Sequence, residues 1–207
     1  FKTDGTKMFI TGTSSDAVNE YALSTAWDVS SASFTVAFSV SSQDVSPQGV
    51  TFNPNGTQMY VTGNVSNAIF EYTLSTAWDV SSASYASKSL SVGTEEGEPR
   101  GVEFNSNGTK VFITGSANDS VFQYNLTTAY DISTGSYSGV SFAISEDGES
   151  RGPKFKSDGS KMYILGFTND SVFQYTTLSD LTAGQSYYVQ TDGTLSTTAG
   201  DPSVFAG

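Results

Sequence analysis

Residues 52–63 read FNPNGTQMYVTG, and this stretch decides the fold because the chain contains it four times. The other copies are FKTDGTKMFITG at 1–12, FNSNGTKVFITG at 104–115 and FKSDGSKMYILG at 155–166. Their first residues are spaced by 51, 52 and 51 residues. A Tyr keeps the same spacing in every copy: Tyr21, Tyr72, Tyr124 and Tyr175. A long period held by two anchors indicates a repeat architecture, in which each unit packs on its neighbours.

Each repeat is predicted to contain four short strands, as the second copy illustrates. Residues 49–52 form the first strand, and an Asn-Pro-Asn-Gly turn follows, in which Gly56 supplies a positive φ. Residues 58–62 and 68–74 form the second and third strands, and residues 85–92 form the fourth. A connection, LSTAWDVSSAS at 74–84, joins the last two strands. No segment carries a helical apolar period.

Repeated four-stranded units of about 50 residues predict an all-β fold, a β-propeller of four blades. We expect one domain over 1–207, with repeats at 1–51, 52–103, 104–154 and 155–207, and with the fourth outer strand at 185–190. Residues 201–206 resemble a first strand, and the first repeat lacks one. We therefore expect Pro202, Val204 and Phe205 to form the missing strand beside Phe1. This strand would close the ring within the chain or enter a neighbouring subunit.

The composition narrows the classes of function. The chain has no Cys and no His, which excludes disulfides, His-ligated metals and nucleophiles that depend on either residue. It has 21 acidic and 9 basic residues, a net charge of −12. This charge repels phosphate backbones and anionic lipids, so we predict no nucleic-acid partner. No apolar run approaches the ~20 residues of a membrane span, and we predict no membrane insertion.

Residues 52–74 resemble the YVTN family of propeller repeats, through the stretch quoted above. The resemblance covers about half of each repeat and implies a secreted or cell-surface protein, such as a surface-layer component. The enzymatic relatives of that family, the lactonase-like propellers, usually have seven blades and act with polar residues that include His. With four repeats and no His in the chain, we expect that this activity does not carry over.

Residues 181–207 resemble the ends of virion structural proteins of aquatic phages. The WDVSSAS repeats are similar to repeats in such phages and in aquatic bacteria. These resemblances imply a non-enzymatic structural or adhesive protein that acts outside the cell, at a cell surface or in a virion. It would self-associate as a subunit of a virion appendage or an extracellular filament. The alternatives are a surface module that binds glycans or Ca²⁺ and, third, a lactonase-like hydrolase.

Acidic residues gather in two loops that precede first strands, and a propeller places these loops on one face. The candidate metal ligands are Glu95, Glu96, Glu98, Glu146, Asp147 and Glu149. Several carboxylates close together suit Ca²⁺, so we consider Ca²⁺ possible and expect no other cofactor. The alternative is a solvated acidic rim.

Gln48, Arg100 and Arg151 occupy equivalent positions in three repeats, directly after these loops. Aimed at the ring centre, they are candidates for binding an acidic or sugar ligand. The alternative is that the arginines pair with neighbouring carboxylates and reduce repulsion near the axis.

Six Asn residues lie in Asn-x-Ser/Thr sequons and are glycosylation candidates: Asn55, Asn64, Asn107, Asn118, Asn125 and Asn169. The alternative is turn chemistry, which repetition copies along the chain. Two Trp-Asp pairs suggest a WD40 propeller, but the Gly-His partner is absent. We therefore expect Trp27, Trp78 and the equivalent Tyr130 to have packing or turn roles.

Overall fold

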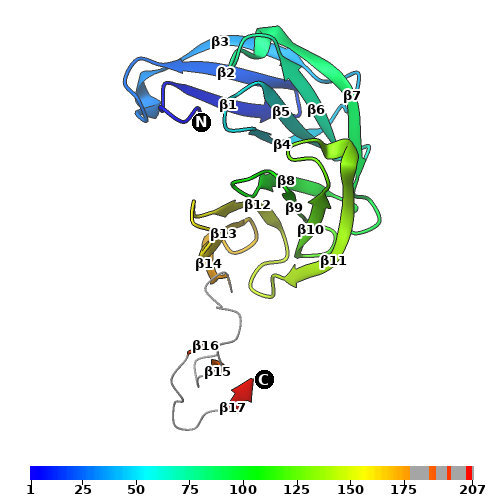
Figure 1. Cartoon of the computed structure of the whole chain (residues 1–207). Coiled ribbons are helices and arrows are strands. Elements are labelled where there is room, and N and C mark those ends of the chain that lie inside the picture. Colours follow the sequence, from blue (N-terminus) through cyan, green and yellow to red (C-terminus); the bar gives the residue numbers. More distant parts are fainter. Residues whose placement is uncertain (178–186, 190–194, 197–203, 207) are drawn as a thin grey trace. The chain divides into compact units, whose positions relative to one another are not determined.

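A computed structural model describes residues 1–177, 187–189, 195–196 and 204–206 (Figure 1). The chain divides into two compact units, Phe1–Tyr175 and Thr176–Gly207. That residues 1–207 form one domain stays a prediction. The first unit contains all four copies of the stretch quoted above, and the described residues of the second form three short strands.

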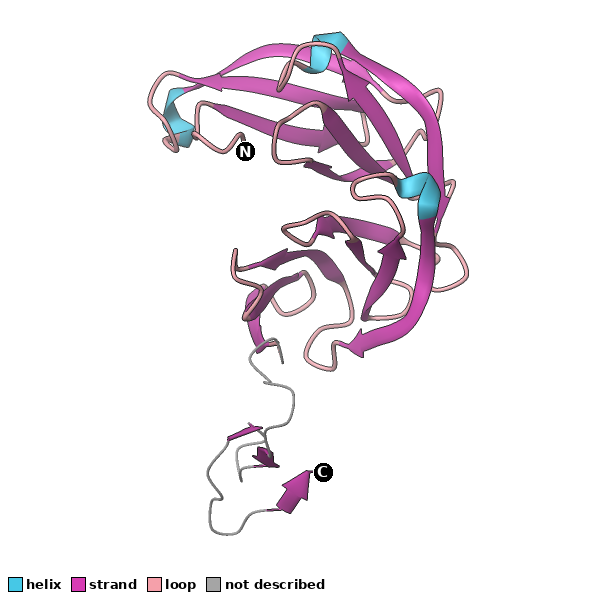
Figure 2. Cartoon of the chain, viewed as in Figure 1, coloured by secondary structure: helices cyan, strands magenta, loops and turns pink. Residues whose placement is uncertain are grey.

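Four antiparallel sheets follow one another along the first unit (Figures 1 and 2). The first sheet has the order β1 (Lys7–Gly12), β2 (Ala17–Leu23), β3 (Ala32–Ser39). The second has the order β4 (Pro47–Phe52), β5 (Gln58–Gly63), β6 (Ala68–Leu74), β7 (Ala83–Ser91). The third has the order β8 (Pro99–Phe104), β9 (Lys110–Gly115), β10 (Ser120–Leu126), β11 (Gly135–Ala143). The fourth has the order β12 (Ser150–Phe155), β13 (Lys161–Gly166), β14 (Ser171–Thr176).

Each sheet is a blade of a propeller, as the sequence predicts. Neighbouring strands are joined in chain order, and the first strand of each complete blade lies on the inner side of the arc in Figure 1. The third predicted strand, 68–74, coincides with β6. The fourth begins earlier than predicted, at Ala83, because a turn of 3₁₀ helix shortens the connection before it.

These 3₁₀ turns recur in three repeats: η1 (Val29–Ser31), η2 (Val80–Ser82) and η3 (Ile132–Thr134), coloured cyan in Figure 2. An Asp precedes each turn and accepts a hydrogen bond from a backbone N–H inside it. In η2, Asp79 Oδ1 accepts from the Ser81 N–H at 3.0 Å. The Asp of each Trp-Asp or Tyr-Asp pair is therefore a helix cap, which accounts for its recurrence in this connection.

Apolar side chains fill the spaces between consecutive sheets. The Phe that ends one inner strand packs on a ring of the preceding sheet, with centroids 4.5 Å apart in all three interfaces. The ring pairs are Phe9 with Phe52, Tyr60 with Phe104, and Phe112 with Phe155. One contact, used three times, fixes how each blade packs on the next.

Trp78 has the expected packing role. Its ring lies 5.2 Å from Phe52, and its backbone N–H donates to the carbonyl of Gly56 at 2.9 Å. A Cβ on Gly56 would lie 2.3 Å from this indole, and Gly56 has a φ of 72°. The turn glycine therefore serves two purposes, a left-handed backbone and a close approach by the ring.

The second unit contains β15 (Tyr187–Val189), β16 (Leu195–Ser196) and β17 (Val204–Ala206), in the order β16-β15-β17. β15 falls where the fourth outer strand was expected, but it pairs with β16 and β17 and not with β14. Val204 and Phe205 likewise pair with β15, whereas the closing strand was expected beside Phe1. Pro202 lies outside the described residues. Within the described part of the chain, no helix is long and apolar enough to cross a bilayer.

Candidate functional site

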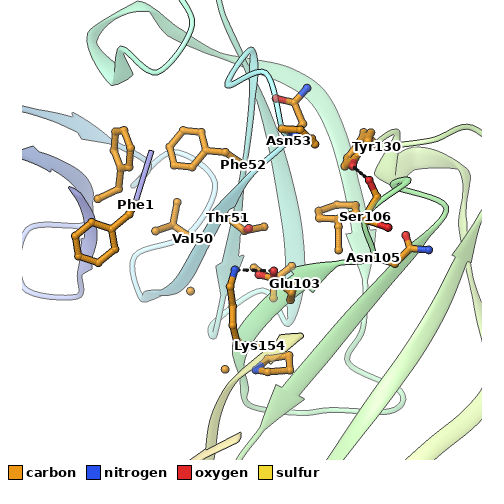
Figure 3. Close-up of a pocket in the computed structure, with 18 of the residues that line it drawn as sticks. Phe1, Val50, Thr51, Phe52, Asn53, Glu103, Asn105, Ser106, Tyr130 and Lys154 are labelled. Carbon is orange, nitrogen blue, oxygen red and sulfur yellow. Dashed lines mark hydrogen bonds and ion pairs between the residues drawn. The ribbon is translucent and has the colours of Figure 1, made fainter. Parts of the chain in front are cut away.

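The inner strands β4, β8 and β12 line a cavity of about 780 Å³ in the first unit (Figure 3). Residues of all three strands contribute to its wall, together with the turns that follow β4 and β8. A cavity of this volume is in the range that holds a small organic ligand. The repeat therefore builds a binding-sized space from strands that are far apart in sequence.

Two glycines allow the inner strands to lie close together. A Cβ on Gly101 would lie 2.2 Å from the Cα of Gly152 on the next strand. The Thr114 hydroxyl accepts a hydrogen bond from the Gly152 N–H at 3.1 Å, across the same boundary. Bulkier residues would separate the strands, so the cavity wall depends on these small residues.

Three residues at equivalent positions meet in the middle of the wall: Thr51 on β4, Glu103 on β8 and Lys154 on β12. The Lys154 ammonium lies 2.7 Å from the Glu103 carboxylate (Figure 3), and Thr51 lies beside the same carboxylate. Burial raises the pKa of Glu103, although Lys154 and Thr51 oppose that effect. A carboxylate that holds its proton more tightly than usual, beside a cavity, is suited to accept a proton.

Gln48 and Arg100 also line this cavity, at the beginning of their strands. The Arg100 guanidinium donates to Gln48 Oε1 at 3.2 Å, to Ser116 Oγ at 3.2 Å and to Glu98 Oε2 at 3.0 Å. Hydrogen bonds from Ser116 and from Arg100 lower the pKa of Glu98. Two of the three ligand candidates thus meet at the wall, and Arg100 also pairs with a neighbouring carboxylate, as the alternative predicted.

Arg151, the third ligand candidate, lines the cavity as well. It donates to Glu149 Oε2 at 3.1 Å, and its guanidinium lies 4.3 Å from the centre of the Phe167 ring. The carboxylate and the ring hold this cation at one end of the wall. The three candidates therefore share one site, in which both arginines already have acidic partners.

The acidic candidates for a metal do not converge. Glu96 and Asp147 are buried, and each accepts hydrogen bonds from backbone N–H groups of the turn that follows the second strand of the next repeat. Glu95 accepts from the Tyr124 hydroxyl at 2.7 Å, and Glu146 accepts from the Tyr175 hydroxyl at 2.9 Å.

Glu98 and Glu149 pair with Arg100 and Arg151, as described above. Among the described residues, no three acidic groups lie close enough together to hold a metal ion. In this structure, the loop acids order turns and hold arginines.

The sequons lie at turns and strand ends. Asn64 is half-buried, and the other five Asn residues are exposed. Asn55 Oδ1 accepts from the Thr57 N–H at 3.1 Å and from the Thr57 hydroxyl at 2.7 Å. Asp158 makes the same two bonds to Ser160 in the fourth repeat. The shared geometry shows that this position serves the turn, and glycosylation stays a prediction.

The pair Glu103–Lys154 was not among the sequence-based candidates. A signal for it exists in the repeat: the residue before the last Phe of the inner strand is Thr51, Glu103 or Lys154, whereas its neighbours hardly change. A variable position inside an otherwise constant strand indicates a side chain that serves something other than the fold. That Glu103 contacts Lys154 could not be inferred from the sequence, because the contact depends on the distance between neighbouring inner strands.

No protein-family model matches the chain, and no curated protein matches it. Among solved structures, it is similar to a proposed 6-phosphogluconolactonase from Bacteroides uniformis, with a TM-score of 0.58 and 13% identity. A proposed 6-phosphogluconolactonase from Bacteroides fragilis gives a TM-score of 0.55 and 14% identity. Each match covers 94% of this chain and 54% of the other.

Hydrazine synthase from Kuenenia stuttgartiensis is similar over 84% of this chain and 43% of its own, with a TM-score of 0.54 and 18% identity. The chain thus spans about half the length of these structures. At such low identity the likeness establishes the propeller-type fold.

The comparisons contradict our prediction of a non-enzymatic structural protein of a virion or extracellular filament. Two of the similar structures are proposed lactonases, which favours the interpretation that we had placed last. The absence of His does not exclude a hydrolase, because a carboxylate can also act as a general base. The resemblance to phage and virion proteins finds no support in these comparisons.

Proposed function

We propose that this chain is part of a lactonase-like hydrolase and that the cavity on the inner strands binds a sugar lactone. The observation that carries the proposal is the pair Glu103–Lys154, a carboxylate with a raised pKa and an ammonium 2.7 Å apart in a ligand-sized cavity. Similarity to two proposed 6-phosphogluconolactonases supports the reaction class. Because the chain spans about half of those structures, the activity of the whole protein is part of the proposal.

In the proposed reaction, Glu103 removes a proton from a water molecule, and the water oxygen attacks the carbonyl carbon of the lactone. The carbonyl electrons move to its oxygen, where the Lys154 ammonium stabilises the negative charge. The ring C–O bond then breaks, and the departing oxygen takes the proton from Glu103. The product is a hydroxy acid, and no other reactant is needed.

The arginines at the other end of the wall suit an anionic substituent. Arg100 and Arg151 line the same cavity, and each already holds a carboxylate, Glu98 or Glu149. A phosphate on the sugar, as in the substrate named for the similar structures, could replace these partly exposed carboxylates. The unphosphorylated lactone would then bind more weakly.

The test is hydrolysis of 6-phosphogluconolactone by the purified chain, followed by proton release above the spontaneous rate. We expect Glu103→Gln to lower kcat by about 10²- to 10⁴-fold, the usual effect of losing a general base. The matched control is Asp158→Asn, which also removes one acidic charge. Its turn has Asn at the same position in two other repeats, Asn55 and Asn107.

Two results would refute the proposal. One is a wild-type rate no higher than the spontaneous rate for both the phosphorylated and the unphosphorylated lactone. The other is full activity in Glu103→Gln. The pH profile adds a further check, because Glu103 must be deprotonated to act. The rate should fall on the acidic side at a pH above the ordinary pKa of a glutamate, since burial raises the pKa of Glu103.

A further inference from the structure

The interfaces inside the first unit share one aromatic contact. A ring on the second strand of one blade packs on a Phe of the next blade, and that Phe packs on an aromatic residue of its own connection. In the first interface, Phe9 lies 4.5 Å from Phe52 and 6.2 Å from Trp78. In the second, Phe104 lies 4.5 Å from Tyr60 and 5.5 Å from Tyr130.

The two end blades of the unit carry the two halves of this contact. In the first blade, Phe1 lies 5.5 Å from Trp27, as Phe52 lies 5.2 Å from Trp78. In the last blade, Tyr163 occupies the position of Phe9, and no ring among the described residues packs on it. The first blade therefore presents a pair of rings, and the last blade presents the single ring on which such a pair packs in the inner interfaces.

The aliphatic residues around the rings show the same division. In the last blade, Val172 is 67% exposed, while the equivalent residues of inner blades, Ile69 and Val121, are 0% and 5% exposed. Leu165, on the neighbouring strand, is also exposed. This open surface, Tyr163, Leu165 and Val172, is called the trailing face.

The first blade has the complementary surface. Val29 is 61% exposed, while the equivalent Val80 and Ile132 are fully buried. Ile10 and Trp27 are exposed beside it. We call Phe1, Ile10, Trp27 and Val29 the leading face, since their equivalents in the inner blades receive the preceding blade.

Polar groups at the two faces also match. In the first two interfaces, a carboxylate accepts from the first N–H of the next 3₁₀ turn: Glu20 from Val80 at 3.0 Å and Glu71 from Ile132 at 3.3 Å. Gln174 holds the acceptor position on the last blade, and Val29 holds the donor position on the first. The amide oxygen of Gln174 could accept from the Val29 N–H in the same way.

We propose that two copies of this chain associate head to tail, with the trailing face of each on the leading face of the other, and close a single ring. The interfaces between blades inside the first unit show the geometry of the proposed contact. Each of them joins a surface equivalent to the trailing face to a surface equivalent to the leading face. The cavity opens on the inner strands, so the partner's inner strands would complete its wall.

The test is the mass of the whole chain in solution, by light scattering between about 1 and about 100 μM, the range in which interfaces of moderate affinity assemble. We expect twice the mass of one chain at the upper end. Val172→Asp and Val29→Asp should each give monomers, because each buries a charge in both interfaces of the ring. Val65→Asp is the matched control, since Val65 is 64% exposed but lies on the turn between β5 and β6 of the second blade.

Mixing the two variants separates head-to-tail from head-to-head association. Each variant keeps one intact face, so the mixture should form a pair through one wild-type interface, although neither variant pairs alone. The proposal is overturned by a monomeric wild type, which would mean that residues 176–207 or further repeats cover these faces. It is also overturned by species larger than two chains, or by a dimer that Val172→Asp leaves intact. These measurements do not depend on catalysis, so they stand apart from the test of the proposed function.

Discussion

The third and fourth repeats begin with similar sequences but have different surroundings. In the third, β9 and β10 have sheets on both sides, and Thr114 and Val121 are buried. In the fourth, the equivalent Leu165 and Val172 of β13 and β14 are exposed. The comparison teaches that a blade of this repeat supplies only half of each interface and depends on its neighbours for the other half.

The largest difference is expected from the Phe that ends the inner strand. Phe104 is buried between Tyr60 and Tyr130, so Phe104→Ala should lower the free energy of unfolding by about 3–5 kcal/mol. Phe155 is only partly buried, so Phe155→Ala should cost about 1–2 kcal/mol because less area is lost. Urea denaturation measures both values. Equal losses would mean that the fourth repeat is covered as well as the third.

The turn glycines give the next largest difference. A Cβ on Gly56 would meet the Trp78 ring at 2.3 Å, whereas none of the described atoms lies within 4 Å of one on Gly159. Both have a positive φ, so both substitutions cost backbone strain. We expect about 2–4 kcal/mol for Gly56→Ala, because overpacking adds to the strain, and about 1 kcal/mol for Gly159→Ala. Thermal unfolding of the two variants side by side checks this order, and a reversed order would contradict it.

The buried carboxylate between the second and third blades should come next. Glu71 accepts hydrogen bonds from Gln58 at 2.9 Å and from the Ile132 N–H at 3.3 Å, and it lies 3.4 Å from Lys88. Glu71→Ala leaves the N–H without its acceptor, for which we expect a loss of about 2–3 kcal/mol. Gln123, its equivalent in the third repeat, is not buried, so Gln123→Ala should cost less than about 0.5 kcal/mol. If the Gln123 variant lost as much as the Glu71 variant in urea, this account of the interface would be wrong.

The smallest effect concerns pH. Burial raises the pKa of Glu103 in the folded chain, so folding favours its protonated form. The stabilisation is present below the pKa of the unfolded chain and is lost as the pH rises through the folded pKa. Relative to Glu103→Gln, the wild type should therefore have a higher urea midpoint in acid than at neutral pH. A difference that is constant with pH would show that Glu103 has no shifted pKa.

Much of this fold could be predicted from the repeat period. The four blades and the order of their strands follow from spacing and alternation in the sequence. The 3₁₀ turn after Asp79 did not, because its signal is a cap within a connection that has no apolar period. The strand partners of 187–189 and 204–206 could not be predicted either, since short strands pair by tertiary contacts that local pattern does not contain.

The candidate site was predicted in part. Gln48, Arg100 and Arg151 were selected from their equivalent positions, and all three line the cavity. Glu103 and Lys154 were missed, because an acidic and a basic residue 51 positions apart have no local signature. Their contact depends on how close the inner strands lie, which Gly101 and Gly152 set through packing.

The most direct test of the central claim is amide hydrogen exchange of the whole chain, compared between β9–β10 and β13–β14 at several protein concentrations. At low concentration, we predict faster exchange in β13 and β14, since one side of their sheet is uncovered. Raising the concentration should slow exchange in β13 and β14 and leave β9 and β10 unchanged, because a second copy covers the trailing face. Equal protection of the two repeats at every concentration would contradict the account.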